Sequence, residues 1–406
     1  MSERTLALED AILQPQDDLA KKQRLALMVG VGGAAAAAVG YFLQPADQAF
    51  VTFSRTYLVA NLLWLGVAAG LLALGMINHL SGGVWGALMR RVFEAAGRTI
   101  PVFFLLLLPF LYFGGIDALY PWANPEIVAN DSLIRHKTPY LNTNFFLLRV
   151  FIYLAFLSAF GFMLSRLSHR HDETGDEAPY IAMKRLSALG MILFILLGTL
   201  ASVDFIMSQD PHWFSSLFGA AWAAGQALSA FAFMIPMMIF LMNRKPLEGL
   251  ITKKQFHDYG KFMLAFVMVW AYFTLSQYLI IWSGNLPEEI LWYIHRNEHG
   301  WKLISVLLVV GHFFLPFALL LSQDLKKVPR LLMVVAFWVL LMRWLDLYWQ
   351  TAPNYSHDHV AFAPLLDLGL PVAIGGLWVS LLFGQLKKKP IVPINEPDFK
   401  EVYAHA

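Results

Sequence analysis

The hydrophobic positions of this chain fall into long continuous runs, and most of the charged positions lie between them. A helix needs about 20 apolar residues to cross a hydrocarbon core about 30 Å thick, and ten stretches reach or approach this length. They are residues 24–43, 55–79, 99–117, 144–166, 185–208, 216–242, 259–282, 301–322, 329–349 and 364–386. The pattern predicts an all-α integral membrane protein with ten transmembrane helices. Residues 24–386 would form the membrane domain, with tails at 1–23 and 387–406.

Composition supports this prediction and excludes several kinds of chemistry. The 406 residues are 58% hydrophobic and 14% charged, whereas soluble domains carry about 25% charged residues. The chain has no Cys, which excludes disulfides, thiolate-held iron–sulfur clusters, c-type haem attachment and cysteine zinc sites. A b-type haem would need two facing histidines inside the membrane, and only His312 lies near the middle of a span. We therefore expect no metal and no redox cofactor bound by this chain.

The distribution of basic residues predicts the orientation. Of the 30 lysine and arginine residues, 23 fall in the tails and in every second connection, and Arg343 lies inside a span. The opposite side has six, in its connections or at the adjoining span ends: Arg55, Arg135, Lys137, Arg149, Arg296 and Lys302. Because basic residues concentrate in cytoplasmic loops, both ends of the chain should be cytoplasmic. On the opposite side, residues 283–300 contain an aromatic, amphipathic segment suited to the membrane interface.

The ninth span contains two ionisable side chains, and such groups are costly inside a membrane. Arg343 and Asp346 are three residues apart on one helical face, and Gln350 follows one turn later. An unpaired arginine there would be unfavourable, so we expect a carboxylate partner. The sequence leaves open a structural ion pair, a proton relay or a headgroup-binding element.

The end of the fifth span contains Asp204, one turn before Ser208. Asp204 could be solvated, cap the next segment, pair with Arg343, or pass protons. Asp210 and His212 follow in an interfacial turn. His212 titrates in the physiological range, although a surface histidine is commonly inert.

The seventh span has polar groups at turn spacing. Tyr272 and Ser276 lie on one face, with Gln277 beside them. This stripe would either hold a file of water molecules or form hydrogen bonds between helices.

The eighth span places His312 four residues before Pro316. Proline lacks an N–H, so the carbonyl of residue 312 loses its helical partner. Imidazole and freed carbonyl form a polar spot that another side chain or water must satisfy, so His312 is either a packing residue or a relay member. Asp367 and Pro371 repeat this spacing near the end of the tenth span, where a structural role is favoured.

The first span contains Gly30, Gly32 and Gly33. This pattern superficially matches a dinucleotide-binding loop, but no strand precedes it. Small residues that allow close helix packing explain it better.

Three segments resemble one known family. They are ASVDFIMSQDPHWFSSLFGA (201–220), YFTLSQYLIIWSGNLPEEILWYIHRN (272–297) and HFFLPFALLLSQDLKK (312–327). They are similar to the second large membrane subunit of bacterial alternative complex III, within the polysulphide-reductase NrfD-like family. That complex is a quinol:electron-acceptor oxidoreductase, and the resemblance covers nearly all of residues 24–386.

The resemblance implies a specific architecture and specific partners. Spans two to five and six to nine would form two four-helix bundles, with the remaining helices flanking them. The partners would be a sister membrane subunit and periplasmic iron–sulfur and multihaem cytochrome c subunits in the bacterial cytoplasmic membrane. Family members oxidise quinol near the periplasmic face and are proposed to conduct protons through half-channels. Quinone or quinol is therefore a possible ligand, although the sister subunit is the better candidate for the active quinol pocket.

The leading hypothesis is a cofactor-free subunit of a quinol-oxidising respiratory complex. A proton path lined by Asp204, Tyr272, His312, Arg343 and Asp346 would open toward the periplasm. One alternative is a structural membrane anchor whose polar groups only hold helices together. The other is a secondary transporter, but the inverted repeats common in that class are not visible in this sequence.

Overall fold

The computed structural model describes residues 10–12, 15–356, 359–387 and 390–404. Within this part of the chain, ten helices are long and apolar enough to cross a membrane, and each overlaps one of the ten predicted spans. The prediction of an all-helical chain with ten membrane-length helices is confirmed. These helices are those expected of a multi-pass membrane protein. Part of the two predicted tails lies outside the described residues.

In chain order the helices are α1 (Gln16–Phe42), α2 (Ala49–Ser81), α3 (Val84–Ala87), α4 (Arg90–Thr99), α5 (Val102–Tyr112), α6 (Gly115–Leu119), α7 (Pro125–Asn130), α8 (Ser132–Lys137), α9 (Thr143–Thr174), α10 (Glu177–Phe205), α11 (Phe218–Leu241), α12 (Lys253–Gly284), α13 (Pro287–His295), α14 (Trp301–Leu308), α15 (Leu315–Leu321), α16 (Gln323–Lys327), α17 (Pro329–Thr351), α18 (Pro364–Leu386) and α19 (Pro397–Ala404). The 3₁₀ helices η1 (Pro121–Ala123), η2 (Met207–Gln209) and η4 (Ala352–Asn354) and the π-helix η3 (Val309–Phe314) connect or interrupt them.

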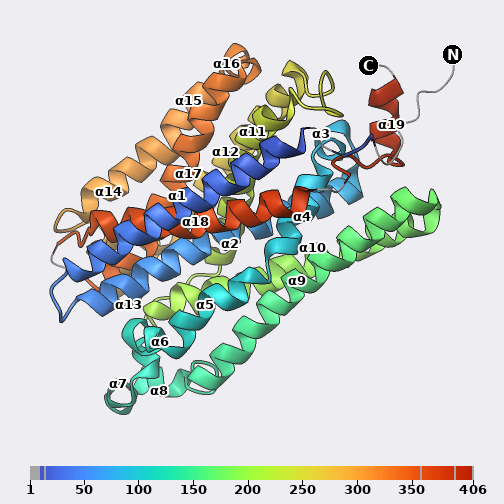
Figure 1. Cartoon of the computed structure of the whole chain (residues 1–406). Helices are drawn as coiled ribbons and strands as arrows, with labels where there is room; N and C mark the ends of the chain where they lie inside the picture. Colours follow the sequence, from blue (N-terminus) through green and yellow to red (C-terminus); the bar gives the residue numbers. More distant parts are fainter. Residues whose placement is uncertain (1–9, 13–14, 357–358, 388–389, 405–406) are drawn as a thin grey trace.

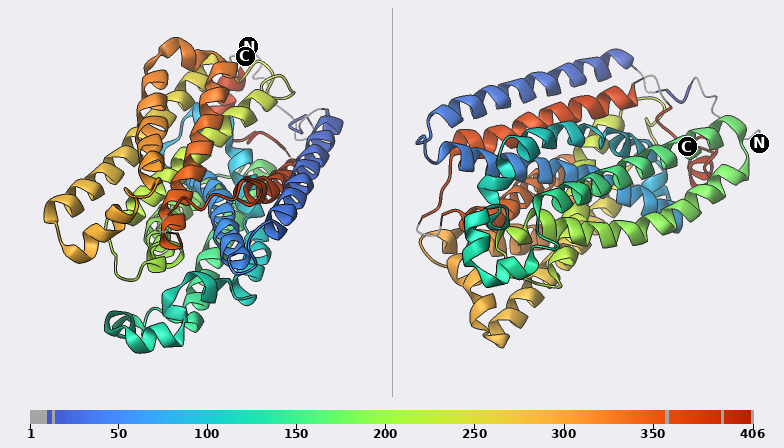
Figure 2. Two further views of the ribbon diagram at one scale, coloured as in Figure 1. Left: turned by 90° about the vertical axis from the view of Figure 1, so that its left-hand side faces the viewer. Right: turned by 90° about the horizontal axis from the view of Figure 1, so that it is seen from below.

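The contacts among the long helices show which of them are neighbours. α2, α4, α9 and α10 each contact the next in that order, and α10 contacts α2 in turn. α11 packs against α12 and α17, and α14 and α15 contact α17 and α12 respectively. α11 also lies against α2 and α10. α1 and α18 run side by side along one flank (Figures 1 and 2).

The two ends of this assembly are distinct. The start of α1 and the C-terminal helix α19 lie at one end, with α3 (Figure 1). We call this the terminal end. The short helices α6, α7 and α8 lie at the opposite end, which we call the loop end (Figure 1).

Some helix boundaries differ from the predicted spans. α1 begins at Gln16, so part of the predicted N-terminal tail is helical. The third membrane-length helix begins at Arg90 rather than at residue 99, and it is interrupted at Pro101, between α4 and α5. Arg90 and Arg91, which were predicted to lie in a loop, form the start of this helix. Both are buried in ion pairs.

The contact between α1 and α18 depends on glycine. A Cβ added to Gly33 would lie 2.7 Å from the Ala373 nitrogen, and one added to Gly376 would lie 2.4 Å from the Gly30 nitrogen. Only a residue without a side chain lets the two backbones approach this closely. The close-packing interpretation is therefore confirmed for Gly30 and Gly33 of the first span, whereas Gly32 meets no neighbour.

Candidate functional site

Asp204, near the end of α10, is fully buried and is held by two side chains of α9. Arg149 donates from Nε to Oδ2 and from Nη2 to Oδ1, both at 2.8 Å. The Tyr153 hydroxyl donates to Oδ2 at 2.5 Å. Residues 149 and 153 are one turn apart and share a face of α9, so one helix supplies all three donors. Bidentate arginine–carboxylate pairs are among the strongest charge-assisted hydrogen bonds.

This geometry decides between the interpretations of Asp204. Its side chain is neither solvated nor used to cap the next segment, and its cationic partner is Arg149 rather than Arg343. Those three interpretations are wrong. The hydroxyl of Ser208 donates to the main-chain carbonyl of Asp204 at 2.7 Å and does not contact the carboxylate. A role in proton transfer stays a prediction.

The Arg149 guanidinium lies between two aromatic rings. Its Cζ is 3.9 Å from the centroid of Tyr140 and 4.4 Å from that of Phe145. Stacked arginine retains its charge while shielded from water. Burial raises the pKa of the Tyr140 hydroxyl, and the charge of Asp204 raises it further. Tyr140 therefore keeps its proton at neutral pH.

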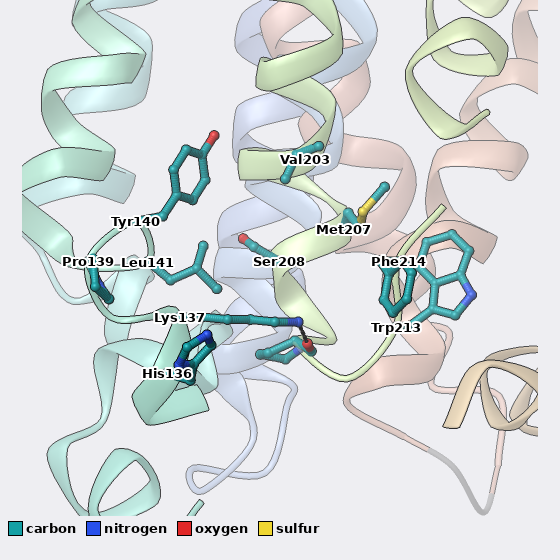
Figure 3. A pocket seen from close by; sticks show the side chains of 11 residues that line it. His136, Lys137, Pro139, Tyr140, Leu141, Val203, Met207, Ser208, Trp213 and Phe214 are labelled. Carbon is teal, nitrogen blue, oxygen red and sulfur yellow. Dashed lines mark hydrogen bonds between the residues drawn. The ribbon is translucent and has the colours of Figure 1, made fainter. Parts of the chain in front are cut away.

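A cavity of about 270 Å³ lies beside this site at the loop end. We call it the vestibule; it is lined by His136, Lys137, Pro139, Tyr140, Leu141, Val203, Met207, Ser208, Pro211, Trp213 and Phe214 (Figure 3). Lys137 extends along one side, and its Nζ donates to the Pro211 carbonyl at 2.6 Å (Figure 3). Small-molecule sites occupy about 300–1,000 Å³, so the vestibule can hold water or a ring-sized head group.

A smaller cavity lies on the inner side of the site. Its volume is about 40 Å³, and both Tyr153 of α9 and Gln226 of α11 line it among apolar side chains. A buried water needs at least about 10–15 Å³ and two to four polar partners, so this cavity is large enough for a water molecule. Tyr153 therefore contacts Asp204 on one side and this cavity on the other.

A second ionic cluster lies around α17. Arg343 and Asp346 form the expected ion pair within α17. Asp346 also accepts hydrogen bonds from Trp270 Nε1 at 3.2 Å and from Gln350 Nε2 at 2.9 Å. The guanidinium packs on Gly225 of α11, where a Cβ would lie 2.5 Å from the arginine Cζ. The structure thus confirms a carboxylate partner for Arg343 on its own helical face.

His312 stacks on Trp270 with ring centroids 4.0 Å apart. It is fully buried, and neither of its ring nitrogens has a hydrogen-bond partner among the described residues. His312 lies in the π-helix η3, four residues before Pro316. The regular α-helical hydrogen bonding is interrupted in this segment. Such π segments recur at functional sites. The stacking places His312 in the Arg343–Asp346 cluster through Trp270.

Replacement of His312 by phenylalanine tests whether these nitrogens have a role. Phenylalanine keeps the stacking on Trp270 and removes two buried polar atoms, each of which costs about 1–3 kcal/mol when unsatisfied. We therefore expect the H312F protein to unfold at a higher temperature than the wild type in detergent. A lower unfolding temperature would mean that water or a ligand binds the imidazole.

The polar stripe of α12 does not point into the interior. Tyr272 is 67% exposed and Ser276 is half-buried. Gln277 is buried, but it accepts from the Ser215 hydroxyl at 2.9 Å and donates to the Tyr293 hydroxyl at 3.0 Å. Turn spacing correctly placed Tyr272 and Ser276 on one face. That face points outward, because the opposite face of α12 packs on α11.

The remaining candidates lie near the vestibule. His212 pairs with Asp131, with Nε2 2.7 Å from Oδ2, and its side chain is 51% exposed. Asp210 is half-buried, and its Oδ1 accepts the backbone N–H of His212 at 3.3 Å. Both belong to the surface of the loop end rather than to the buried site.

A third buried ion pair ties α2 to α18. Arg55 Nη2 lies 3.0 Å from Asp367 Oδ1, and the Thr56 hydroxyl donates to the same oxygen at 2.6 Å. Asp367 Oδ2 accepts the backbone N–H of Ala363 at 2.7 Å. These contacts agree with the structural role predicted for Asp367.

The terminal end contains an ionic cluster that the sequence did not predict. Arg91 pairs with Glu94 at 2.6 Å and with Asp172, and it donates to the Ser168 hydroxyl at 3.0 Å. His169 Nδ1 lies 3.7 Å from Glu94 Oε2. We call these five residues of α4 and α9 the terminal cluster. All are buried except His169, which is partly buried.

Three of the buried arginines were not recognised from the sequence as site residues, because they were counted only as basic residues at one side or the other of the membrane. Arg149, Arg55 and Arg91 lie close to span ends, so they were treated as loop charges. A usable signal was present for Arg149, which lies about as far from the start of the fourth span as Asp204 does from the end of the fifth. In two consecutive antiparallel helices, residues at the same depth in the membrane lie side by side. Arg149 and Asp204 are therefore placed to form a pair.

The chain was compared with protein-family models and with curated proteins. No family model matches it, and no curated protein matches it.

Proposed function

We propose that this chain is an integral subunit of a quinol-oxidising respiratory complex in the bacterial cytoplasmic membrane. It contributes a proton path and the surroundings of a quinol site at the loop end. Iron–sulfur clusters and c-type haems belong to periplasmic partner subunits, and a sister membrane subunit of similar fold lies beside it. The proposal rests on the family resemblance together with the buried site around Asp204.

The proposal includes an orientation and a grouping of helices. The terminal end is cytoplasmic, as the excess of basic residues there favours, and the loop end is periplasmic. α2, α4–α5, α9 and α10 form one four-helix bundle, and α11, α12, α14–α15 and α17 form the other. The neighbour relations among the helices support this grouping.

The observation that carries the proposal is that Tyr153, which donates to the buried Asp204 carboxylate, also lines an interior cavity. Tyr153 and Arg149 hold the Asp204 carboxylate. The vestibule lies toward the loop end, and the cavity shared by Tyr153 and Gln226 lies toward the interior. A tyrosine hydroxyl bonded to a carboxylate can pass a proton between that carboxylate and water in the cavity that the tyrosine lines, because the hydroxyl both donates and accepts. A purely structural ion pair does not need a tyrosine hydroxyl with water-sized space beside it.

The path differs from the one predicted from sequence. Tyr272 is exposed on α12, and Arg343, Asp346 and His312 form a separate cluster. We therefore restrict the proposed loop-end path to Asp204, Tyr153 and the vestibule.

Tyr153→Phe tests the path with little disturbance of the fold. It removes the hydroxyl that contacts Asp204 and leaves the Arg149 ion pair in place. Loss of a positioned proton carrier commonly costs about 10²–10⁴-fold, so we expect quinol turnover of the intact complex to fall by at least about tenfold.

Tyr120→Phe is the matched control. Tyr120 is equally buried, but its hydroxyl donates to the main-chain carbonyl of Phe205 at 3.0 Å. The control should assemble and turn over like wild type. Unchanged turnover of intact Tyr153→Phe complex, measured with the same acceptor, would remove the proton role.

One observation favours a second candidate, a structural anchor. Two buried ion pairs, Arg55–Asp367 and Arg149–Asp204, each join two helices, as expected of pairs that hold a helix bundle together. An anchor predicts that Tyr153→Phe lowers the yield of complex and leaves the turnover of each assembled complex unchanged.

A further inference from the structure

The C-terminal segment, residues 390–404, folds back over the terminal cluster. Asn395 Nδ2 donates to the main-chain carbonyls of His171 and Asp172, both at 3.0 Å. The Asp172 carboxylate is itself part of the terminal cluster, through its pair with Arg91. One amide of the segment therefore fixes the backbone that holds a cluster carboxylate.

Two acidic side chains of the segment dock on the turn between α2 and α4. Glu396 pairs with Arg90, and both side chains are only 1% exposed. Arg90 also donates to Asn78 Oδ1 of α2 at 3.0 Å. Asp398 Oδ2 accepts the backbone N–H of Gly83 at 2.6 Å. The acidic residues of the segment are thus complementary to a cation and a free donor at the terminal end.

Apolar contacts complete the docked arrangement. Ile391, Val392 and Phe399 are almost fully buried, and the Ile391 N–H donates to the Ala11 carbonyl at 2.8 Å. α19 has eight residues, too few for an isolated helix to persist in water. The segment therefore keeps its shape because it is docked, and loss of the docking contacts should release it.

The cluster beneath the segment has unused capacity for water. Glu94 Oε1 and Asp172 Oδ1 are buried and make no hydrogen bond within the described residues. The Nε atom of Arg91 is also buried and makes no hydrogen bond within the described residues. Buried polar atoms normally form hydrogen bonds to protein or water. Water that reached the terminal cluster would therefore bind at these three atoms.

We propose that residues 390–404 act as a lid that controls the access of water, and with it protons, to the terminal cluster. With the lid docked, Glu94 and Asp172 are closed off from the solvent at the terminal end. With the lid released, both carboxylates and Arg91 become hydrated. As a step in proton uptake the lid rests on the proposed function; as a control of water access it does not.

The absence of cysteine from the chain allows a direct test. Ser168→Cys places a single thiol in the terminal cluster, and the purified full-length chain is treated with a water-soluble maleimide. The lid variants are Glu396→Gln with Asp398→Asn, which removes two docking carboxylates, and Asn395→Ala, which removes one amide and changes no charge. We expect each to increase the labelling rate at position 168 by at least about tenfold, as local opening becomes more populated.

Ser202→Cys is the control for general loosening of the fold. Ser202 is fully buried in α10 near the loop end, and its hydroxyl donates to the Thr199 carbonyl at 2.7 Å. Labelling at position 202 should be slow and equal with and without the lid substitutions.

Equal labelling at position 168 in the wild-type and Asn395→Ala backgrounds would overturn the lid, and so would an equal rise at positions 168 and 202. Labelling requires no turnover, so this result is independent of the Tyr153→Phe experiment. If labelling confirms the lid but Tyr153→Phe leaves turnover unchanged, the lid is retained and the proposed proton path is rejected.

Discussion

Replacement of Arg149 by alanine is expected to lower the free energy of unfolding by about 3–5 kcal/mol. The substitution leaves the Asp204 carboxylate fully buried without its cation. It also removes the stacked layer between Tyr140 and Phe145. The loss can be measured as a shift of the unfolding transition of the purified chain in detergent.

Two further variants separate the ion pair from other effects of the substitution. Arg166→Ala removes an exposed arginine of the same helix and should change stability by no more than about 0.5 kcal/mol. Arg149→Met combined with Asp204→Leu replaces the whole pair by apolar side chains, which is often nearly neutral for a buried pair. We expect the double variant to regain most of the stability lost in Arg149→Ala. A double variant as unstable as the single one would mean that the pair is not the source of the loss.

Replacement of Gly33 by leucine is expected to force α1 away from α18. A Cβ at this position would lie 2.7 Å from the Ala373 nitrogen and 2.8 Å from the Gly369 carbonyl oxygen. Both are main-chain atoms in the middle of a helix, so they cannot rotate aside as a side chain would. We expect a loss of about 3 kcal/mol, the upper part of the range for overpacking, measured by thermal unfolding and by the yield of folded protein.

The neighbouring glycine provides a matched control. A Cβ at Gly32 meets nothing within 4 Å, and Gly32→Leu adds the same side chain to the same helix. It should leave the unfolding temperature unchanged. Similar losses in both variants would show that leucine disturbs α1 itself rather than its contact with α18.

Much of the architecture could be predicted because membrane crossing depends on local composition. Each span carries its own apolar length, and the lipid requires every backbone group inside it to be satisfied within the helix. The ten helices therefore follow from the sequence without knowledge of their neighbours. Gly30 and Gly33 of α1 were correctly interpreted for the same reason, since small residues in an apolar helix allow close packing whatever the partner.

The composition of the site was only partly predictable. Asp204, Arg343, Asp346 and His312 were recognised because ionisable groups inside apolar runs are rare. Their partners were not, except within α17, where Arg343 and Asp346 are three residues apart. The partner of Asp204 lies 55 positions away on α9, and it had been counted only among the basic residues of the side opposite the chain ends.

The sequence by itself determined the ten helices, the cofactor chemistry excluded by the lack of cysteine, and the Arg343–Asp346 pair within α17. The tertiary structure decided which face of α12 points outward, which arginine meets Asp204, and that the C-terminal segment covers the terminal cluster. The physical reason is the range of the interactions. Helix formation in an apolar run is set by neighbouring residues. Ion pairing between helices is set by packing, which brings together charges that no local pattern relates.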